Sequence, residues 1–193
     1  MVTQVISSRA RDNRNLVLSL SRLGIKSPRL LGAFAATPVE LFGILEDPIT
    51  TVRTLAWELQ LAELSPHDRV LDLGCASGYS AAILSQLVRH VDVVPLAPWM
   101  ASQIRARLGR HGYEAEVHDG DPAVGWPAGA PYTAIIARAI SGSISRRLVD
   151  QLACGGRLIE QISDLDGPHF ARVVRTSVDA ISLVDYGLLP TGR

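Results

Sequence analysis

A chain of 193 residues is long enough for one domain and short for two ordinary ones. Hydrophobic residues make up 47% of it and charged residues 20%, which is typical of a globular rather than a disordered protein. Nineteen basic and nineteen acidic residues cancel, so the composition argues against a nucleic acid partner. The two cysteines form neither a disulfide framework nor a zinc motif, so we expect a cytoplasmic protein without a metal.

The first thirty residues hold six basic side chains and a single acidic one, Asp12. A transit peptide has this composition, and so does a solvated amphipathic helix. We favour the helix, because the pattern continues without a break into the segments described below. Apolar runs stay shorter than the roughly 18 residues that a membrane-spanning helix needs, so we expect no membrane partner.

Apolar side chains at helical spacing predict two N-terminal helices, over residues 14–23 and 28–36. Residues 38–50 contain three helix-breaking prolines and glycines and are predicted to be irregular. Helical spacing returns over residues 51–64. The N-terminal part of the chain, residues 1–50, is therefore predicted to be a helical extension.

From residue 69 onward, short apolar strands alternate with helices. The predicted strands cover residues 69–73, 91–94, 115–118, 132–137 and 157–160, and two more cover 169–175 and 180–185. The predicted helices cover residues 79–89, 99–110 and 145–152. This alternation predicts an α/β fold in which residues 51–193 form one compact unit, with a doubly wound, mostly parallel sheet.

A glycine-rich turn follows the first predicted strand, where such sheets bind their ligands. Its glycine spacing is wrong for a dinucleotide fingerprint. It resembles motif I of the S-adenosyl-L-methionine-dependent methyltransferases, with Ala76 at the place of the middle glycine. The resemblance implies a Rossmann-like methyltransferase fold and a cofactor site at Asp72, Gly74, Ala76 and Gly78. A turn without any ligand is the alternative interpretation.

Four further segments resemble one family, the protein-L-isoaspartate O-methyltransferases. They are residues 24–31, 37–42, 119–127 and 154–158. The third corresponds to the family's Gly-Asp-Gly…Gly-Trp-Pro and the fourth to its Pro-Gly-Gly-Arg-Leu. The resemblance extends from about Leu16 to Ile162 and is specific as a combination.

The resemblance implies roles for single residues. Thr50 takes the place of the hydroxyl that the family puts at the substrate carboxylate; alternatively it caps a helix at 51–64, and Thr51 serves equally well. Asp121, beside Gly120, takes the place of the acid that accepts from the adenine amino group, or is a turn aspartate. Asp72 lies near the amino-acid end of the cofactor, whose ammonium, or the amides of the glycine turn, would be its partner.

Three departures from the family pattern bear on activity. Pro95 replaces the acid that binds the ribose hydroxyls, and we interpret the nearby Asp92 as solvated or paired with a surface arginine. Val52 replaces a proline. Arg138 replaces a small residue, and either pairs with the substrate carboxylate or extends to solvent.

The family resemblance implies an enzyme of protein repair, which methylates the free carboxylate of isoaspartyl residues with S-adenosylmethionine. The expected partner is an isoaspartyl protein or peptide, and the expected assembly is a monomer or weak homo-oligomer. A weakened or inactive methyltransferase fold that acts as a binding or scaffold module is the alternative. It is favoured by Pro95, Val52 and Arg138, and by Thr133, which takes the place of the aspartate in the family's Phe-Asp-Ala-Ile. A methyltransferase for another small carboxylate is a third possibility.

Overall fold

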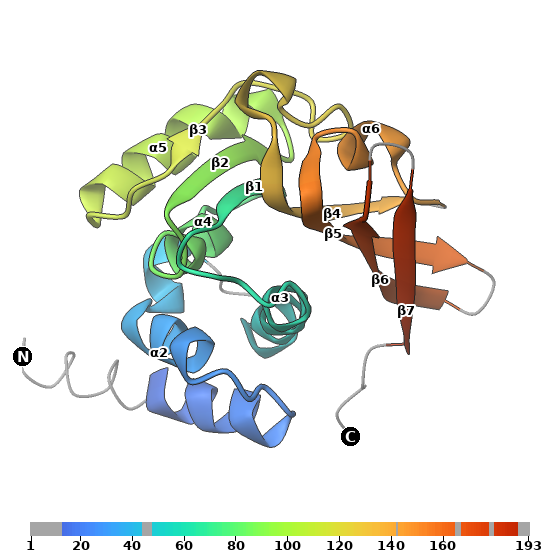
Figure 1. Ribbon diagram of the computed structural model, residues 1–193. Helices are drawn as coiled ribbons and strands as arrows, with labels where there is room; N and C mark the ends of the chain where they lie inside the picture. The colour runs from blue at the N-terminus through green and yellow to red at the C-terminus, as the bar shows by residue number, and fades with distance from the viewer. Residues whose placement is uncertain (1–12, 44–47, 142, 165–166, 178–179, 189–193) are drawn as a thin grey trace, which may run out of the picture.

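A single seven-stranded sheet organises the chain, in the order β3-β2-β1-β4-β5-β6-β7 (Figure 1). The computed structural model describes residues 13–43, 48–141, 143–164, 167–177 and 180–188. The strands are β1 (Arg69–Cys75), β2 (His90–Pro95), β3 (Glu116–Val117), β4 (Tyr132–Ser141), β5 (Leu152–Asp164), β6 (Gly167–Arg175) and β7 (Ile181–Leu188). The pairs among β1 to β5 are parallel, whereas β6 pairs antiparallel with β5 and β7. The predicted mostly parallel sheet is confirmed.

Helices precede the sheet and connect its parallel strands. Residues 13–22 are helical, and α2 (Pro28–Ala36), η1 (Val39–Phe42) and α3 (Pro48–Leu61) follow. Between strands lie α4 (Tyr79–Leu84), η2 (Pro98–Met100), α5 (Ala101–Arg110), η3 (Pro127–Gly129) and α6 (Arg146–Val149). Among the described residues, no helix has the length and apolar content needed to cross a membrane.

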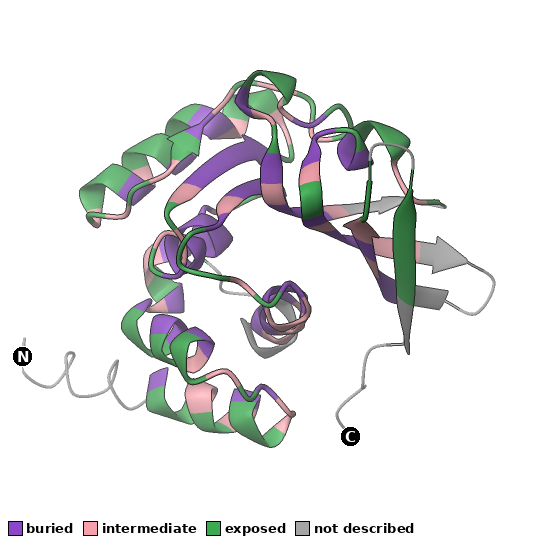
Figure 2. Cartoon of the chain, viewed as in Figure 1, coloured by how far each residue is buried: buried purple, intermediate pink, exposed green. Residues whose placement is uncertain are grey.

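Alternate residues of the strands pack on opposite faces of the sheet, as the two-residue period of a strand requires. On one face, Val70 and Ile136 join the apolar side chains of α2, α3, α4 and α5 in a single cluster. On the other face, Leu71 and Ile135 pack with residues of α6. Buried residues fill the central strands, while the part of β7 whose burial is described is exposed (Figure 2).

The N-terminal helices belong to the same core as the sheet. Leu20, Phe34 and Phe42 are buried in the cluster that contains Val70 of β1. The predicted boundary between residues 50 and 51 falls within α3. The division of the chain at that position stays a prediction.

Two predicted boundaries are wrong for local reasons. The helix expected to begin at residue 51 begins at Pro48, because proline fits the first turn of a helix, where its missing N–H is not needed. The strand expected over 157–160 begins at Leu152. Gly155 has a φ of +77°, and the β4–β5 pairing shifts between Tyr132 and Ala134, so the residues before the predicted strand form a bulge inside β5.

Candidate active site

The turn after β1 has the geometry that its glycines predict. Gly74 and Gly78 have φ values of +79° and +87°, a region that favours glycine. A Cβ at Gly78 would also lie 3.2 Å from Ile104 of α5. Ala76 is exposed and needs no glycine. The structure therefore places all the predicted motif I residues at the carboxyl end of β1.

A cavity of about 360 Å³ opens at this turn. Its walls come from the turn itself, from α3, from the start of α4, and from the ends of β4 and β5. The lining residues are Thr54, Leu55, Glu58, Gly74, Cys75, Ala76, Ser77, Tyr79, Ser80, Arg138 and Gln161. Its volume lies in the range of pockets that bind small molecules and cofactors. The cavity is lined both by the backbone of a glycine turn and by charged side chains. This lining suits a ligand that has a polar group at one end.

Asp72 is fully buried on the cavity side of β1. One carboxylate oxygen accepts from the Ser80 hydroxyl at 2.6 Å, and the other accepts from Arg138 Nη1 at 2.5 Å. The partners expected from the sequence were the amides of the glycine turn or the cofactor's ammonium. Among the described residues its partners are Ser80 and Arg138, and not the amides of the glycine turn. A contact between Asp72 and the cofactor's ammonium stays a prediction.

Arg138 lies between two buried carboxylates. Its Nε donates to Glu58 Oε2 at 2.7 Å, and its Nη1 donates to Asp72. Burial alone would lower the pKa of Arg138, but the charges of Asp72 and Glu58 outweigh it and raise the pKa. The interpretation that Arg138 extends to solvent is wrong, since its side chain is only 18% exposed and paired at both ends. Its predicted contact with a substrate carboxylate stays a prediction.

Glu58 is the site residue that the sequence analysis missed. It is 1% exposed, and burial raises the pKa of its carboxyl group although Arg138 acts in the opposite direction. Leu55, Glu58, Leu59 and Ala62 follow the spacing of one helix face, and all four are buried. A charged residue within an otherwise apolar stripe is the signal that could have identified it.

Thr50 lies in the first turn of α3. Because the helix begins at Pro48, neither Thr50 nor Thr51 occupies the capping position before it, and that interpretation is wrong. The side chains of both threonines lie outside the described residues. The role of Thr50 at the substrate carboxylate stays a prediction.

The loop after β3 holds the other predicted cofactor residues. Asp121 is exposed, and its Oδ1 accepts from the Ala123 N–H at 2.9 Å, so the turn interpretation describes its contacts. A Cβ at Gly120 would lie 3.3 Å from Val94, which explains the glycine by close packing. Neither residue lines the cavity at the glycine turn. Their role at the adenine stays a prediction.

Pro95 ends β2 beside Cys75 of the glycine turn and offers no acceptor for a ribose. Asp92, three residues earlier, is buried rather than solvated, which corrects one of our two interpretations. Its partners are His118 Nε2 at 2.6 Å and His90 Nε2 and Arg69 Nη2, both at 3.1 Å. The arginine partner is confirmed.

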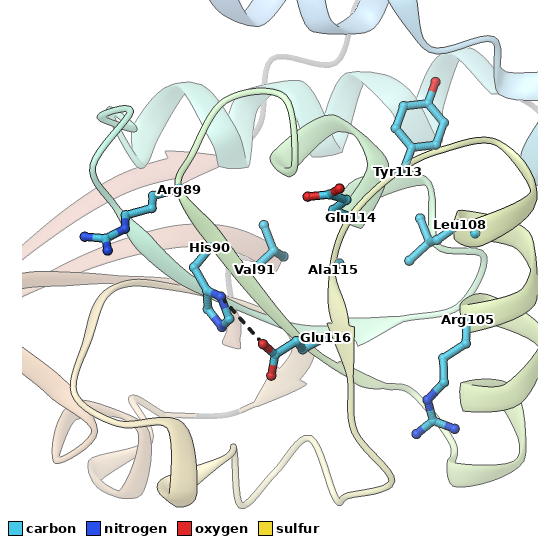
Figure 3. A pocket seen from close by; sticks show the side chains of 10 residues that line it. Arg89, His90, Val91, Arg105, Leu108, Tyr113, Glu114, Ala115 and Glu116 are labelled. Atoms are coloured by element: carbon cyan, nitrogen blue, oxygen red, sulfur yellow. Dashed lines mark ion pairs between the residues drawn. The ribbon is translucent and has the colours of Figure 1, made fainter.

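A second cavity, of about 420 Å³, lies at the amino ends of β2 and β3, away from the glycine turn (Figure 3). His90 and Glu116 face each other there, with Nδ1 and Oε1 3.9 Å apart. Together with Asp92 they offer three atoms within 4.8 Å of one another, close enough for a metal ion. Arg69 already bonds to Asp92. We assign no metal to this place.

Sequence comparisons identify the family. Residues 31–185 match the model of the protein-L-isoaspartate(D-aspartate) O-methyltransferase family. Protein-L-isoaspartate O-methyltransferase 1 of Rhodopseudomonas palustris is 31% identical over 94% of this chain and 82% of its own length. The enzyme of that name from Protochlamydia amoebophila is 36% identical over 81% of this chain and 83% of its own length.

Solved structures confirm the fold. A protein-L-isoaspartate O-methyltransferase superposes with a TM-score of 0.75 at 22% identity, covering 94% of this chain and 66% of the other. A Plasmodium falciparum protein described as a putative member of the family, in complex with S-adenosyl-L-homocysteine, gives the same TM-score at 16% identity. That match covers 92% of this chain and 96% of the other. The predicted Rossmann-like methyltransferase fold is confirmed.

Proposed function

This chain belongs to the protein-L-isoaspartate(D-aspartate) O-methyltransferase family, and on that premise we propose that it methylates the free carboxylate of isoaspartyl residues in damaged proteins. It is an S-adenosyl-L-methionine-dependent methyltransferase. The observation that carries the proposal is the cavity at the glycine turn, since it combines motif I backbone with buried charged side chains. We propose that the protein acts in the cytoplasm, as a monomer or weak homo-oligomer.

Methyl transfer to a carboxylate requires the protein to position the two reactants and to do little else. S-adenosylmethionine, when bound, supplies a methyl group on a positively charged sulfur. The carboxylate oxygen of an isoaspartyl residue is already nucleophilic at neutral pH, so the chain needs no general base. Its residues have to hold the two reactants in line and exclude water, which accounts for large rate enhancements by itself.

We propose that Gly74, Ala76 and Gly78 let backbone approach the cofactor closely, as motif I residues do. Gly120 and Asp121 are proposed for the adenine, where a carboxylate suits an amino group that only donates. Thr50 is proposed to orient the substrate carboxylate. Asp72 acts through Arg138, which it holds by a short ion pair at the cavity.

Pro95 predicts weak cofactor binding rather than none. Loss of hydrogen bonds to two ribose hydroxyls costs about 1–3 kcal/mol, or roughly ten- to a hundredfold in affinity. The cavity at the glycine turn does not depend on that contact. We therefore expect slow but selective methyl transfer.

The test uses labelled S-adenosylmethionine and two peptides that differ only in an isoaspartyl or a normal aspartyl residue. We expect label in the isoaspartyl peptide alone. Equal labelling of both peptides would contradict the proposed substrate. No labelling of either, with measurable binding of S-adenosylhomocysteine, would favour the scaffold function instead.

Thr50→Val tests the proposed substrate contact, with Thr51→Val as its matched control. We expect Thr50→Val to slow methyl transfer to the isoaspartyl peptide about tenfold, as loss of one hydrogen bond of about 1.4 kcal/mol would do. Its affinity for S-adenosylhomocysteine should stay nearly unchanged. Equal transfer rates for wild type and Thr50→Val would remove Thr50 from the site.

A further inference from the structure

Two buried polar atoms beside the glycine turn have no hydrogen-bond partner among the described residues. They are Oε1 of Glu58 and Nη2 of Arg138. Both residues line the 360 Å³ cavity. They are joined to each other by a hydrogen bond of 2.7 Å from Arg138 Nε to Glu58 Oε2. One unused acceptor and one unused donor therefore belong to a single ion pair. Buried polar atoms are rarely left without a partner, so the pair requires an explanation.

The charges of this cluster are unbalanced. Asp72 and Glu58 each carry a carboxyl group, and Arg138 supplies one positive charge between them. With both carboxyl groups ionised the cluster has a net charge of −1. A ligand group that donates and carries a positive charge would offset the charge of Glu58 locally and favour its ionised form, since burial raises the pKa of that carboxyl group. A second group that accepts from a guanidinium would complete the hydrogen bonds of Arg138.

The amino-acid end of a ligand has both groups, an ammonium and a carboxylate separated by one carbon. An isoaspartyl peptide offers the carboxylate but brings no positive charge for Glu58. The glycine turn, which forms another wall of the same cavity, is the part of the fold that receives the cofactor. Position and charge thus favour the cofactor over the peptide as the source of the carboxylate.

We propose that Glu58 and Arg138 form a clamp for the amino-acid end of S-adenosylmethionine, in which Glu58 accepts from the ammonium and Arg138 donates to the carboxylate. This inference rests on the proposed function and adds two specificity-determining residues to its site. Pro95 removes the ribose contact at the adjacent strand, and the clamp supplies affinity at the other end of the same ligand.

The test is calorimetric titration of the whole chain with two ligands. S-adenosylhomocysteine carries the amino-acid end, whereas 5′-methylthioadenosine keeps the adenosine and the sulfur and lacks that end. Wild type should bind S-adenosylhomocysteine at least tenfold more tightly. Equal affinity for the two ligands in wild type would overturn the clamp without the use of any variant.

Two mild variants locate the effect. Glu58→Gln removes the charge at constant shape, and Arg138→Lys keeps the charge but loses the planar fork of donors. Each should weaken S-adenosylhomocysteine about tenfold and leave 5′-methylthioadenosine unchanged. Asp68→Asn, a buried carboxylate paired with Arg157 before β1 and outside the cavity, is the control and should change neither affinity. A variant that weakens both ligands equally would show a structural role and overturn the proposal.

A peptide titration separates the two sources of carboxylate. If Arg138→Lys raises the KM for the isoaspartyl peptide and leaves the affinity for S-adenosylhomocysteine unchanged, Arg138 serves the substrate and the clamp is wrong. Failure of the proposed function has a different signature, in which the ligand difference persists but no isoaspartyl peptide is labelled.

Discussion

Two neighbouring parallel strands each bury an aspartate beside an arginine, and the two surroundings differ in one respect. Asp92 of β2 is bonded through both oxygens to Arg69, His90 and His118. Asp72 of β1 is also bonded through both oxygens, but its network continues to Glu58 and Arg138 and stops at two atoms without partners. Among the described residues, the first network leaves Arg69 Nε without a partner, and the second leaves Glu58 Oε1 and Arg138 Nη2 without one. The second network is open at the glycine-turn cavity, which Glu58 and Arg138 line and Arg69 does not.

This difference distinguishes a structural network from a ligand-binding one. Burial and charge do not, because both aspartates are buried and both are paired with an arginine. Arg69 lines neither of the two cavities described above, so its unpartnered Nε has no ligand space beside it and the Asp92 network serves the fold. An open network is a cost to the folded protein until a ligand completes it, because buried polar atoms lose their water without gaining a partner. Function is therefore expected at Asp72 and stability alone at Asp92.

The largest effect is expected from Arg138→Met, which leaves Glu58 and Asp72 facing each other without a positive charge. Removal of one partner from a buried ion pair costs about 3–5 kcal/mol, and we expect the free energy of unfolding in urea to fall by that amount. Glu58→Gln leaves the Asp72–Arg138 pair intact and should cost less. A loss below about 1 kcal/mol for Arg138→Met would show that the cluster does not stabilise the fold.

Asp92→Asn should have a smaller effect of about 1–3 kcal/mol on the free energy of unfolding, because His118 and Arg69 lose a charged acceptor. His118 also stacks on Trp126, with ring centroids 4.2 Å apart, so the change should reach the loop after β3. The control is Glu116→Gln, an exposed group 3.9 Å from His90 that should change stability by less than about 0.5 kcal/mol. An Asp92→Asn protein as stable as wild type would contradict a structural role.

Pro95→Glu tests the binding site through its affinity for the cofactor product. A carboxylate there can accept from two ribose hydroxyls, so S-adenosylhomocysteine should bind about tenfold more tightly, a gain of about 1.4 kcal/mol. Calorimetry checks this, with Pro95→Ala as the control without an acceptor. Unchanged or weaker binding by Pro95→Glu would mean that residue 95 does not face the ribose.

The smallest effect is expected in the pH dependence of stability. Burial alone would raise the pKa of Asp92, but the hydrogen bond from His118 and the charges of His90 and Arg69 outweigh it and lower the pKa below 3.8. The stabilisation from this carboxylate is present above pH 3.8 and is lost as the pH falls through the lowered pKa. Thermal unfolding from pH 5 to pH 2 should show a shallower acid loss for Asp92→Asn than for wild type. Parallel curves would contradict this assignment.

Local sequence predicted the parts of the molecule that depend on local rules. The glycine turn followed from spacing, since Gly74 and Gly78 need positive φ whatever surrounds them. Asp92 was expected to be solvated or paired with an arginine, and the sequence did not indicate that it is buried with two hydrogen-bond partners far away in the chain, Arg69 at the start of β1 and His118 directly after β3. Glu58 meets Arg138 across 80 residues of chain, a pairing that no local pattern contains.

The most direct test of this account is a crystal structure of the complex with S-adenosylhomocysteine. We predict that the ammonium of the ligand lies within hydrogen-bond distance of Glu58 Oε1 and its carboxylate within hydrogen-bond distance of Arg138 Nη2, while the surroundings of Asp92 remain unchanged. The account would be contradicted by a complex in which the amino-acid end of the ligand lies elsewhere and Glu58 Oε1 and Arg138 Nη2 still have no partner.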